Sequence, residues 1–230
     1  MDILLGRKGD TMQQPAGAIF DMDGTLLDSM FYWNQAPEDC LRQIYHKEPT
    51  ADLMEHLKPL TIEEGGAWMK KAYGLSDSGA QIAAQINLLV KRFYTERVLV
   101  KPGAAAWLEA FTRAGIPMAI ATSTDRDLVE AALARTGLGK YFGAVFTCTE
   151  VGAGKGKPDV YEAAARFLGT PYSATWVFED SLFAMRTAKA AGFPVAAVYD
   201  ASQDTLQQEI RALADWYLPS FDAVEPPQWD

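Results

Sequence analysis

The stretch FDMDGTLLDS, residues 20–29, decides the fold that we expect for this chain. It continues a short apolar run, Ala16 to Phe20, that ends abruptly in two aspartates and a glycine. An apolar run followed at once by turn-forming residues predicts a buried strand and a tight turn. Asp21 and Asp23 would therefore leave the carboxyl end of a buried strand, where open α/β sheets place their ligand sites.

Further along the chain, four more apolar runs have the length of buried strands. They are Pro117 to Ala121, Ala144 to Thr147, Thr175 to Phe178 and Pro194 to Val198. Alanine-rich amphipathic stretches separate most of these runs, and such alternation is typical of a parallel sheet covered by helices. We therefore predict an α/β fold with a Rossmann-like, doubly wound parallel sheet at its core.

The segment between Ser29 and about Lys101 has a different pattern, because it contains no strand-like run. Helical periodicity dominates there, most clearly from Ile82 to Phe93, and predicts an inserted all-helical domain. The expected organisation is a core of residues 16–29 and 101–224, a helical domain of residues 30–100, a mobile lead-in of residues 1–15 and a C-terminal tail of residues 225–230.

The composition of the chain excludes several classes of protein. A formal net charge of -9 over 230 residues argues against nonspecific attraction to nucleic acid or anionic lipid. No window approaches the apolar run of about 20 residues that a membrane span needs. Cys40 and Cys148 lie far apart, without the spacing of a disulfide framework or a zinc site. We expect a soluble, cytoplasmic protein that acts on small molecules.

Two carboxylates at the end of a buried strand need a partner of opposite charge. Mg²⁺ prefers hard oxygen ligands and would neutralise both the carboxylates and an incoming phosphate. Asp21 would then attack phosphorus while Asp23 handles the proton of the leaving group. Gly24 would permit a sharp turn, and Thr25 would hold Asp23 through a hydrogen bond. Taken alone, however, the motif is better explained as an Asx turn that follows a strand.

Hydroxyl side chains end the second apolar run, just before a helical stretch. Thr122 and Ser123 are candidates to bind a phosphate, because hydroxyls, backbone N–H groups and a helix dipole act together at such a place. A series of N-cap residues explains the same letters at least as well. The combination with the aspartates after the first strand favours the phosphate site.

Two charged segments complete the set of candidate residues. Lys155, in a glycine-rich loop, could neutralise a nucleophile and a phosphate oxygen, although lysines in such loops are usually solvated. Glu179 and Asp180 follow the apolar run Thr175 to Phe178, where water is partly excluded. Adjacent carboxylates at such a place are more stable as metal ligands than as unpaired charges.

At these four segments the sequence resembles the haloacid dehalogenase superfamily, in the branch that includes β-phosphoglucomutase and phosphoglycolate phosphatase. FDMDGTLLDS is similar to the nucleophile motif, and VFEDS, residues 177–181, followed by AKAAG is similar to the acidic motif. The resemblance extends from about Ala16 to Val224. It implies a Mg²⁺-dependent phosphatase with a helical cap that hydrolyses a small phosphorylated metabolite through an aspartyl-phosphate, as a monomer without nucleic-acid or membrane partners.

The resemblance also implies a role for each matching residue near the first two strands. Asp21 would be the nucleophile and a metal ligand. Asp23 would be the general acid and base, and its backbone carbonyl would also bind Mg²⁺. Thr122 would be the hydroxyl that binds the transferred phosphate.

In the same way, the resemblance assigns the charged residues of the later segments. Asp180 would ligate the metal directly, and Glu179 would act through water or orient Lys155. The family pattern commonly reads lysine, two residues and then Pro-Asp, and Lys155 has this spacing before Pro158 whereas Lys157 does not. Lys155 is therefore our choice between the two lysines.

Two other activities remain open beside the phosphatase. A sugar-phosphate mutase shares all of these residues, but Trp33 stands where β-phosphoglucomutase-like sequences typically have a histidine, which disfavours it. A noncatalytic protein that binds a phosphorylated metabolite is the alternative of a different class. Dehalogenation is disfavoured because the expulsion of halide needs neither Mg²⁺ nor an acid at Asp23. Phosphonate cleavage is disfavoured because the relatives that catalyse it usually lack that second aspartate. The cap would swing on hinges near Ser29 and Lys101 to Gly103.

Overall fold

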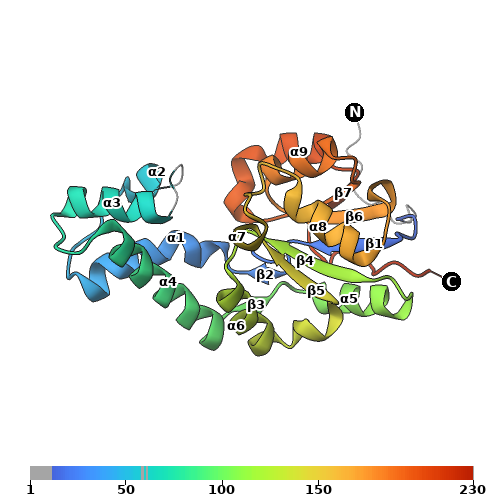
Figure 1. Cartoon of the computed structure of the whole chain (residues 1–230), viewed down its shortest axis with the longest axis horizontal. Coiled ribbons are helices and arrows are strands. Elements are labelled where there is room, and N and C mark those ends of the chain that lie inside the picture. Colours follow the sequence, from blue (N-terminus) through green and yellow to red (C-terminus); the bar gives the residue numbers. More distant parts are fainter. Residues whose placement is uncertain (1–11, 58–59, 61, 230) are drawn as a thin grey trace. The chain divides into compact units, whose positions relative to one another are not determined.

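The computed structural model describes residues 12–57, 60 and 62–229, and these divide into two compact units (Figure 1). Unit 1 runs up to Asp28 and resumes at Val98, whereas unit 2 is the continuous segment Ser29–Arg97. Along those described residues, no helix is long and apolar enough to cross a membrane. Each unit is described separately.

Strands and helices alternate along unit 1. Its elements are β1 (Gly17–Phe20), β2 (Leu27–Asp28), β3 (Leu99–Val100), α5 (Ala104–Arg113), β4 (Met118–Thr122), α6 (Arg126–Thr136), the 3-10 helix η2 (Leu138–Tyr141), β5 (Ala144–Thr147), α7 (Cys148–Val151), α8 (Asp159–Leu168), the 3-10 helix η3 (Tyr172–Ala174), β6 (Thr175–Glu179), α9 (Leu182–Ala190), β7 (Val195–Val198), the 3-10 helix η4 (Ala201–Leu206), α10 (Gln207–Leu213) and β8 (Trp216–Leu218).

The main sheet of the described chain has six strands in the order β5-β4-β1-β6-β7-β8, and all its pairings are parallel. This topology confirms the predicted doubly wound sheet. The strand β8 was not predicted, because Trp216 to Leu218 is too short an apolar run to be recognised. Since β1 pairs with both β4 and β6, the carboxyl ends of these three strands lie at the same edge of the sheet.

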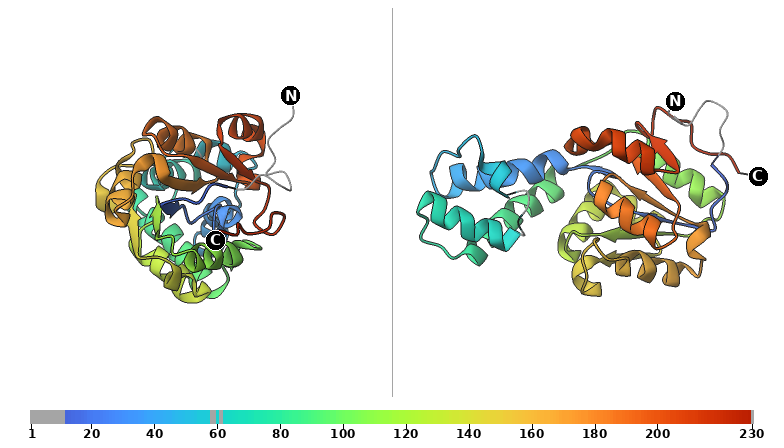
Figure 2. Two further views of the ribbon diagram at one scale, coloured as in Figure 1. Left: turned by 90° about the vertical axis from the view of Figure 1, so that its right-hand side faces the viewer. Right: turned by 90° about the horizontal axis from the view of Figure 1, so that it is seen from above.

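Alternate residues of each central strand point to opposite faces of the sheet. On one face, Ile19 of β1 and Val177 of β6 belong to a buried cluster with residues of α8, α9 and α10. On the other face, the ring of Phe20 stacks on that of Phe178 with centroids 4.3 Å apart, and Phe111 of α5 packs edge-on against both. Helices therefore cover both sides of the sheet, as the two views in Figure 2 show.

Unit 1 also contains a short antiparallel ribbon, made from the residues just before the chain enters unit 2 and just after it returns. Leu27 and Asp28 of β2 pair with Val100 and Leu99 of β3, so the segment expected to be free of strands contains one at its end. Two residues are too few for a recognisable alternation of polar and apolar side chains. Because of this pairing, unit 1 resumes at Val98 rather than at the expected residue 101.

Unit 2 consists of helices alone in its described part, as the inserted helical domain was expected to do. They are α1 (Met30–Asp39), the π-helix η1 (Cys40–Ile44), α2 (Leu53–Leu57), α3 (Ile62–Tyr73) and α4 (Gly79–Glu96). The helix α4 begins with a capping box, in which the side chains of Ser78 and Gln81 each bond the backbone N–H of the other residue. Aromatic rings join α1 to α4, since Tyr32 stacks on Phe93 with centroids 4.3 Å apart.

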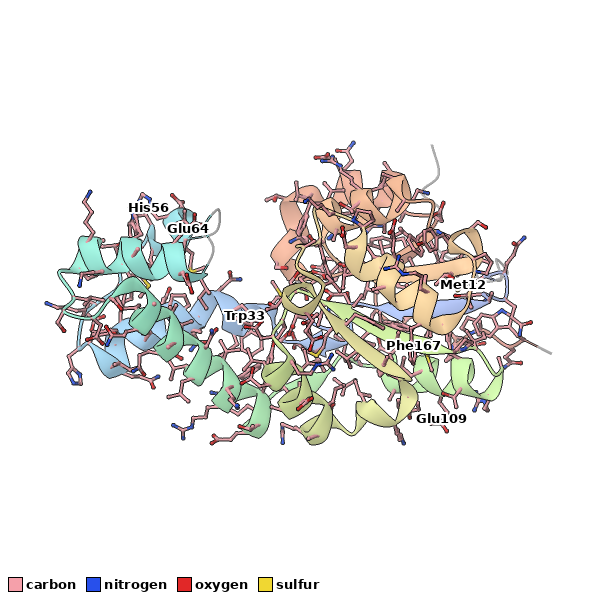
Figure 3. All side chains as sticks on the ribbon, viewed as in Figure 1. Met12, Trp33, His56, Glu64, Glu109 and Phe167 are labelled. Carbon is pink, nitrogen blue, oxygen red and sulfur yellow. The ribbon has the colours of Figure 1, made fainter. Side chains whose placement is uncertain are left out.

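The two ends of the described chain meet on unit 1. Residues 1–11 of the expected lead-in lie outside the described residues, as does residue 230 of the expected tail. Met12, labelled in Figure 3, is 2% exposed, and its carbonyl accepts a hydrogen bond of 3.0 Å from the indole N–H of Trp229. The ring of Trp229 packs edge-on against Phe111, with centroids 5.0 Å apart. These residues of both ends are therefore part of the packed unit.

Candidate active site

Three parallel strands deliver polar residues to one edge of the sheet of unit 1. Asp21 follows β1, Thr122 ends β4, and Glu179 ends β6. Their strands are direct neighbours with β1 in the middle, so the three residues converge although 158 positions separate the first from the last. The edge formed by carboxyl ends is where parallel sheets bind ligands.

Three buried carboxylates lie close together at this edge. Asp21, Glu179 and Asp180 each offer an oxygen, and these oxygens lie within 4.8 Å of one another. Asp180 is 3% exposed and Glu179 is fully buried. Like charges at this spacing repel strongly in a region from which water is excluded, so they require compensation.

A buried lysine provides part of that compensation. The ammonium Nζ of Lys155 lies 2.6 Å from Asp21 Oδ1 and also contacts Glu179 Oε1. Lys157, the other lysine that the sequence offered, is exposed. The loop between α7 and α8 therefore turns Lys155 inward, between two of the carboxylates.

The electrostatics of the cluster show an excess of negative charge. Burial, and then the neighbouring charge of Asp21, raise the pKa of Glu179 and the pKa of Asp180 above their ordinary values. Burial alone would lower the pKa of Lys155, but attraction to Asp21 and Glu179 outweighs it and raises that pKa. One lysine thus faces three carboxylates, and a further cation would relieve their repulsion.

Glu179 is held from two sides by its Oε1 atom. This atom contacts Lys155 and accepts a hydrogen bond of 2.8 Å from the hydroxyl of Tyr161, on α8. Its other oxygen, Oε2, is buried and finds no hydrogen-bond partner among the described residues. Sequence reasoning missed Tyr161, because it occupies an apolar position of an amphipathic helix and carries no signal beyond that of a core residue.

In the turn after β1, the side chain of Thr25 holds Asp180 and not Asp23. We expected Thr25 to hold Asp23, but its hydroxyl donates to Asp180 Oδ1 at 3.3 Å. Gly24 has a φ of 80°, and a Cβ atom there would lie 2.5 Å from Asp180 Oδ2. The expectation was wrong because the side chain of Thr25 points across to the neighbouring strand end, a contact that local turn rules cannot foresee.

Another hydroxyl reaches Asp23 from the loop after β4. Thr124 Oγ1 donates to Asp23 Oδ2 at 2.8 Å, and the backbone N–H of Thr124 donates to Thr122 Oγ1 at 3.1 Å. Ser123 is exposed, and its Oγ lies 3.6 Å from Cys148 Sγ. Thr124 therefore connects Thr122 with Asp23, a contact that the sequence pattern does not indicate.

The residues of this edge fit a divalent cation with a preference for oxygen ligands, such as Mg²⁺. The donor set is made of hard carboxylate oxygens, which is the set that Mg²⁺ selects. The unpartnered Oε2 of Glu179, within the described chain, and the raised pKa values of Glu179 and Asp180 are both features that a bound cation would correct. Asp21, Glu179 and Asp180 are thus the side chains suited to hold it.

Comparison with known proteins gives consistent matches. The family model of the haloacid dehalogenase-like hydrolases matches residues 15–192. Protein CbbY of Rhodobacter capsulatus is 32% identical over 223 residues, which cover 90% of this chain and 93% of that protein. The phosphorylated carbohydrates phosphatase of Thermotoga maritima is 30% identical over 174 residues, which cover 76% of this chain and 80% of that protein.

A solved structure shows the same likeness in three dimensions. The crystal structure of CbbY from Rhodobacter sphaeroides in complex with phosphate matches this chain with a TM-score of 0.74 and 25% sequence identity. The match covers 90% of this chain and 95% of that one. The likeness therefore extends over both units and not over the sheet alone.

Proposed function

Because this chain belongs to the haloacid dehalogenase-like hydrolases, we propose that it is a Mg²⁺-dependent phosphatase that forms an aspartyl-phosphate on Asp21. The observation that carries the proposal is the buried cluster of Asp21, Glu179 and Asp180, in which Asp21 and Glu179 contact the ammonium group of Lys155. A cluster of this kind, built from the ends of the neighbouring strands β1 and β6 and from the loop before α8, is suited to bind and transfer a phosphoryl group.

In the first step, a carboxylate oxygen of Asp21 attacks the phosphorus atom, and the bond from phosphorus to the leaving oxygen breaks. Asp23 gives its proton to that oxygen, so that an alcohol departs. In the second step, Asp23 takes a proton from water, the water oxygen attacks the phosphorus of the aspartyl-phosphate, and the carboxylate of Asp21 is restored with release of phosphate.

Charge control during these steps falls to Lys155 and Thr122. The ammonium of Lys155, already 2.6 Å from Asp21, would stabilise the negative charge that develops on the phosphoryl oxygens. The hydroxyl of Thr122 and the exposed Ser123 would donate to the same oxygens. Mg²⁺ held by Asp21, Glu179 and Asp180 would supply neutralisation of the charge on the phosphate.

The substrates that we propose are small phosphorylated carbohydrates. The support is that the Thermotoga maritima relative, which matches 76% of this chain, is named for this class. The test measures phosphate release from a panel of sugar and polyol phosphates, with Mg²⁺ and with EDTA. We expect release that requires Mg²⁺ and that disappears in Asp21→Asn. Release that survives this substitution would reject Asp21 as the nucleophile.

A sugar-phosphate mutase remains the second candidate, since it would use the same residues. Trp33, on α1 of unit 2 (Figure 3), stands where β-phosphoglucomutase-like sequences typically have a histidine, and this favours the phosphatase. Its indole N–H donates to the hydroxyl of Tyr94 at 3.0 Å. An indole cannot exchange protons as a histidine does. Incubation with hexose 1-phosphates and a bisphosphate activator separates the two activities. Rapid isomerisation without net phosphate release would favour the mutase.

A further inference from the structure

We propose that Thr124 is a positioning residue that aims the carboxyl group of Asp23 at the leaving oxygen, a role that rests on the proposed function. The hydroxyl of Thr124 donates to Asp23 Oδ2 at 2.8 Å, across 101 positions of sequence. Both side chains are buried, with exposed fractions of 9% and 8%. A buried hydrogen bond of this length holds a carboxylate in one orientation.

The backbone on each side of this hydrogen bond is itself fixed. In the turn after β1, the N–H groups of Leu26 and Leu27 both donate to the carbonyl of Met22 at 2.9 Å. The N–H of Thr124 donates to the side chain of Thr122, the last residue of β4. With both backbones fixed, the freedom that remains to Asp23 is rotation of its own side chain, and the bond from Thr124 restricts that rotation.

Helix capping does not account for the hydroxyl of Thr124. The N-cap residue of α6 is Asp125, whose side chain accepts a hydrogen bond of 2.7 Å from Thr149. The hydroxyl of Thr124 points instead to Asp23. Among the hydroxyl residues before α6, Thr124 therefore contacts the site and does not cap the helix.

Orientation matters here because a general acid must lie within hydrogen-bond reach of the oxygen that it protonates. A displacement of about 1 Å can cost on the order of 100-fold in rate. The loss should depend on how much the leaving group needs a proton. Phenolate is a poorer leaving group than p-nitrophenolate, so phenyl phosphate requires protonation by Asp23 more than p-nitrophenyl phosphate does.

The test compares kcat/KM for these two esters in Thr124→Val, which keeps the shape and removes the donor, and in Thr124→Ser, which keeps the donor. kcat/KM reports the step that expels the leaving group. For Thr124→Val we expect a loss of roughly 10-fold or more with phenyl phosphate and a loss of less than about 2-fold with p-nitrophenyl phosphate. Thr124→Ser should resemble the wild type with both esters.

Two controls keep the test sharp. Thr136→Val, on α6, removes a hydroxyl that donates to the carbonyl of Ala132 at 2.7 Å and should leave both rates unchanged. Thr124→Ala is a second variant without the donor, and it should give the same selective loss if Thr124→Val folds poorly. Equal losses with both esters, or no loss with either, would overturn the positioning role alone. Wild-type protein inactive on both esters would overturn the proposed function and this role with it.

Discussion

The ammonium group of Lys155 is buried between two carboxylates, which makes it the residue on which the charge balance of the site most depends. It contacts Asp21 and Glu179 within the same small volume. Removing one partner from a buried ionic cluster leaves the other charges uncompensated, which typically costs about 3–5 kcal/mol. Its neighbour Lys157 is exposed and has the same charge, so it provides a matched comparison.

We predict that Lys155→Met destabilises the protein by about 3 kcal/mol in EDTA and lowers kcat by about 100-fold or more in Mg²⁺. The reason is that Asp21 and Glu179 would repel each other without an intervening cation. Urea unfolding and phosphate release measure the two effects. Lys157→Met should match the wild type in both assays, and equal effects of the two substitutions would contradict the prediction.

For single residues, the sequence predicts which polar side chains follow the strands but not which side chains contact one another. Asp21 and Glu179 follow apolar runs, and that pattern is visible in one dimension. Tyr161 and Thr124 were missed as partners of Glu179 and Asp23, and Thr25 was paired with the wrong aspartate. These contacts join residues far apart in the chain, so their geometry depends on the packing of neighbouring strands.

The turn after β1 is the element that packs against the end of β6. Its centre is Gly24, which has a φ of 80° and lies directly against the carboxylate of Asp180. Any residue other than glycine at position 24 would meet two separate obstacles, the strain of a left-handed backbone and the contact with Asp180. Gly169, at the end of α8, has a φ of 69° with open space around it and meets the first obstacle alone.

We predict that Gly24→Ala weakens Mg²⁺ binding by about 10-fold or more, because the new methyl group displaces Asp180. Gly169→Ala should leave Mg²⁺ binding unchanged. Both substitutions should cost about 1 kcal/mol of backbone strain, and Gly24→Ala should cost more than Gly169→Ala. The Mg²⁺ dependence of phosphate release and urea unfolding test these effects. Equal Mg²⁺ affinity in the two variants would show that Asp180 does not need the space at Gly24.

Elements with a clear pattern could be predicted from the sequence, and short ones could not. The five predicted strands correspond to β1, β4, β5, β6 and β7, because apolar runs of four or five residues stand out between amphipathic stretches. The strands β2, β3 and β8 have two or three residues each, and their pairing depends on partners distant in the sequence. Length therefore limited the prediction more than composition did.

On the scale of the whole molecule, unit 1 carries its negative cluster at the sheet edge within a chain of net charge -9. Burial and the charge of Asp21 raise the pKa of Glu179 from its ordinary 4.5 to about 7. A carboxyl with a raised pKa in the folded state binds protons more tightly there than in the unfolded state. Its contribution to stability is therefore complete below pH 4.5 and declines as the pH rises towards 7.

We predict that the metal-free protein loses stability over this range of pH, by up to about 3 kcal/mol from Glu179 alone. Mg²⁺ should offset the loss, because it binds the deprotonated carboxylates. The measurement is the free energy of unfolding against pH in EDTA and in Mg²⁺, and the difference between the two curves should grow with pH. A constant difference, or the same difference in Asp180→Asn, would contradict the prediction.

The chain crosses between the units at Asp28–Ser29 and at Arg97–Val98. After the second crossing, the N–H of Lys101 donates to the carbonyl of Leu26 at 2.8 Å, and its ammonium pairs with Asp200 at 2.9 Å. Lys101 is thus attached to the sheet unit on both sides. We propose that unit 2 moves as a cap and that its second hinge lies before Val98, in place of the hinge expected at Lys101 to Gly103.

The central claim is that phosphate passes through Asp21. In Asp23→Asn the second step should be slow, because no base activates the water, so the phosphorylated protein should accumulate with p-nitrophenyl phosphate and Mg²⁺. Borohydride reduces an aspartyl-phosphate to homoserine, which peptide mass spectrometry locates in the chain. The account predicts homoserine at residue 21. Homoserine at another aspartate, or turnover with unmodified Asp21 throughout, would contradict it.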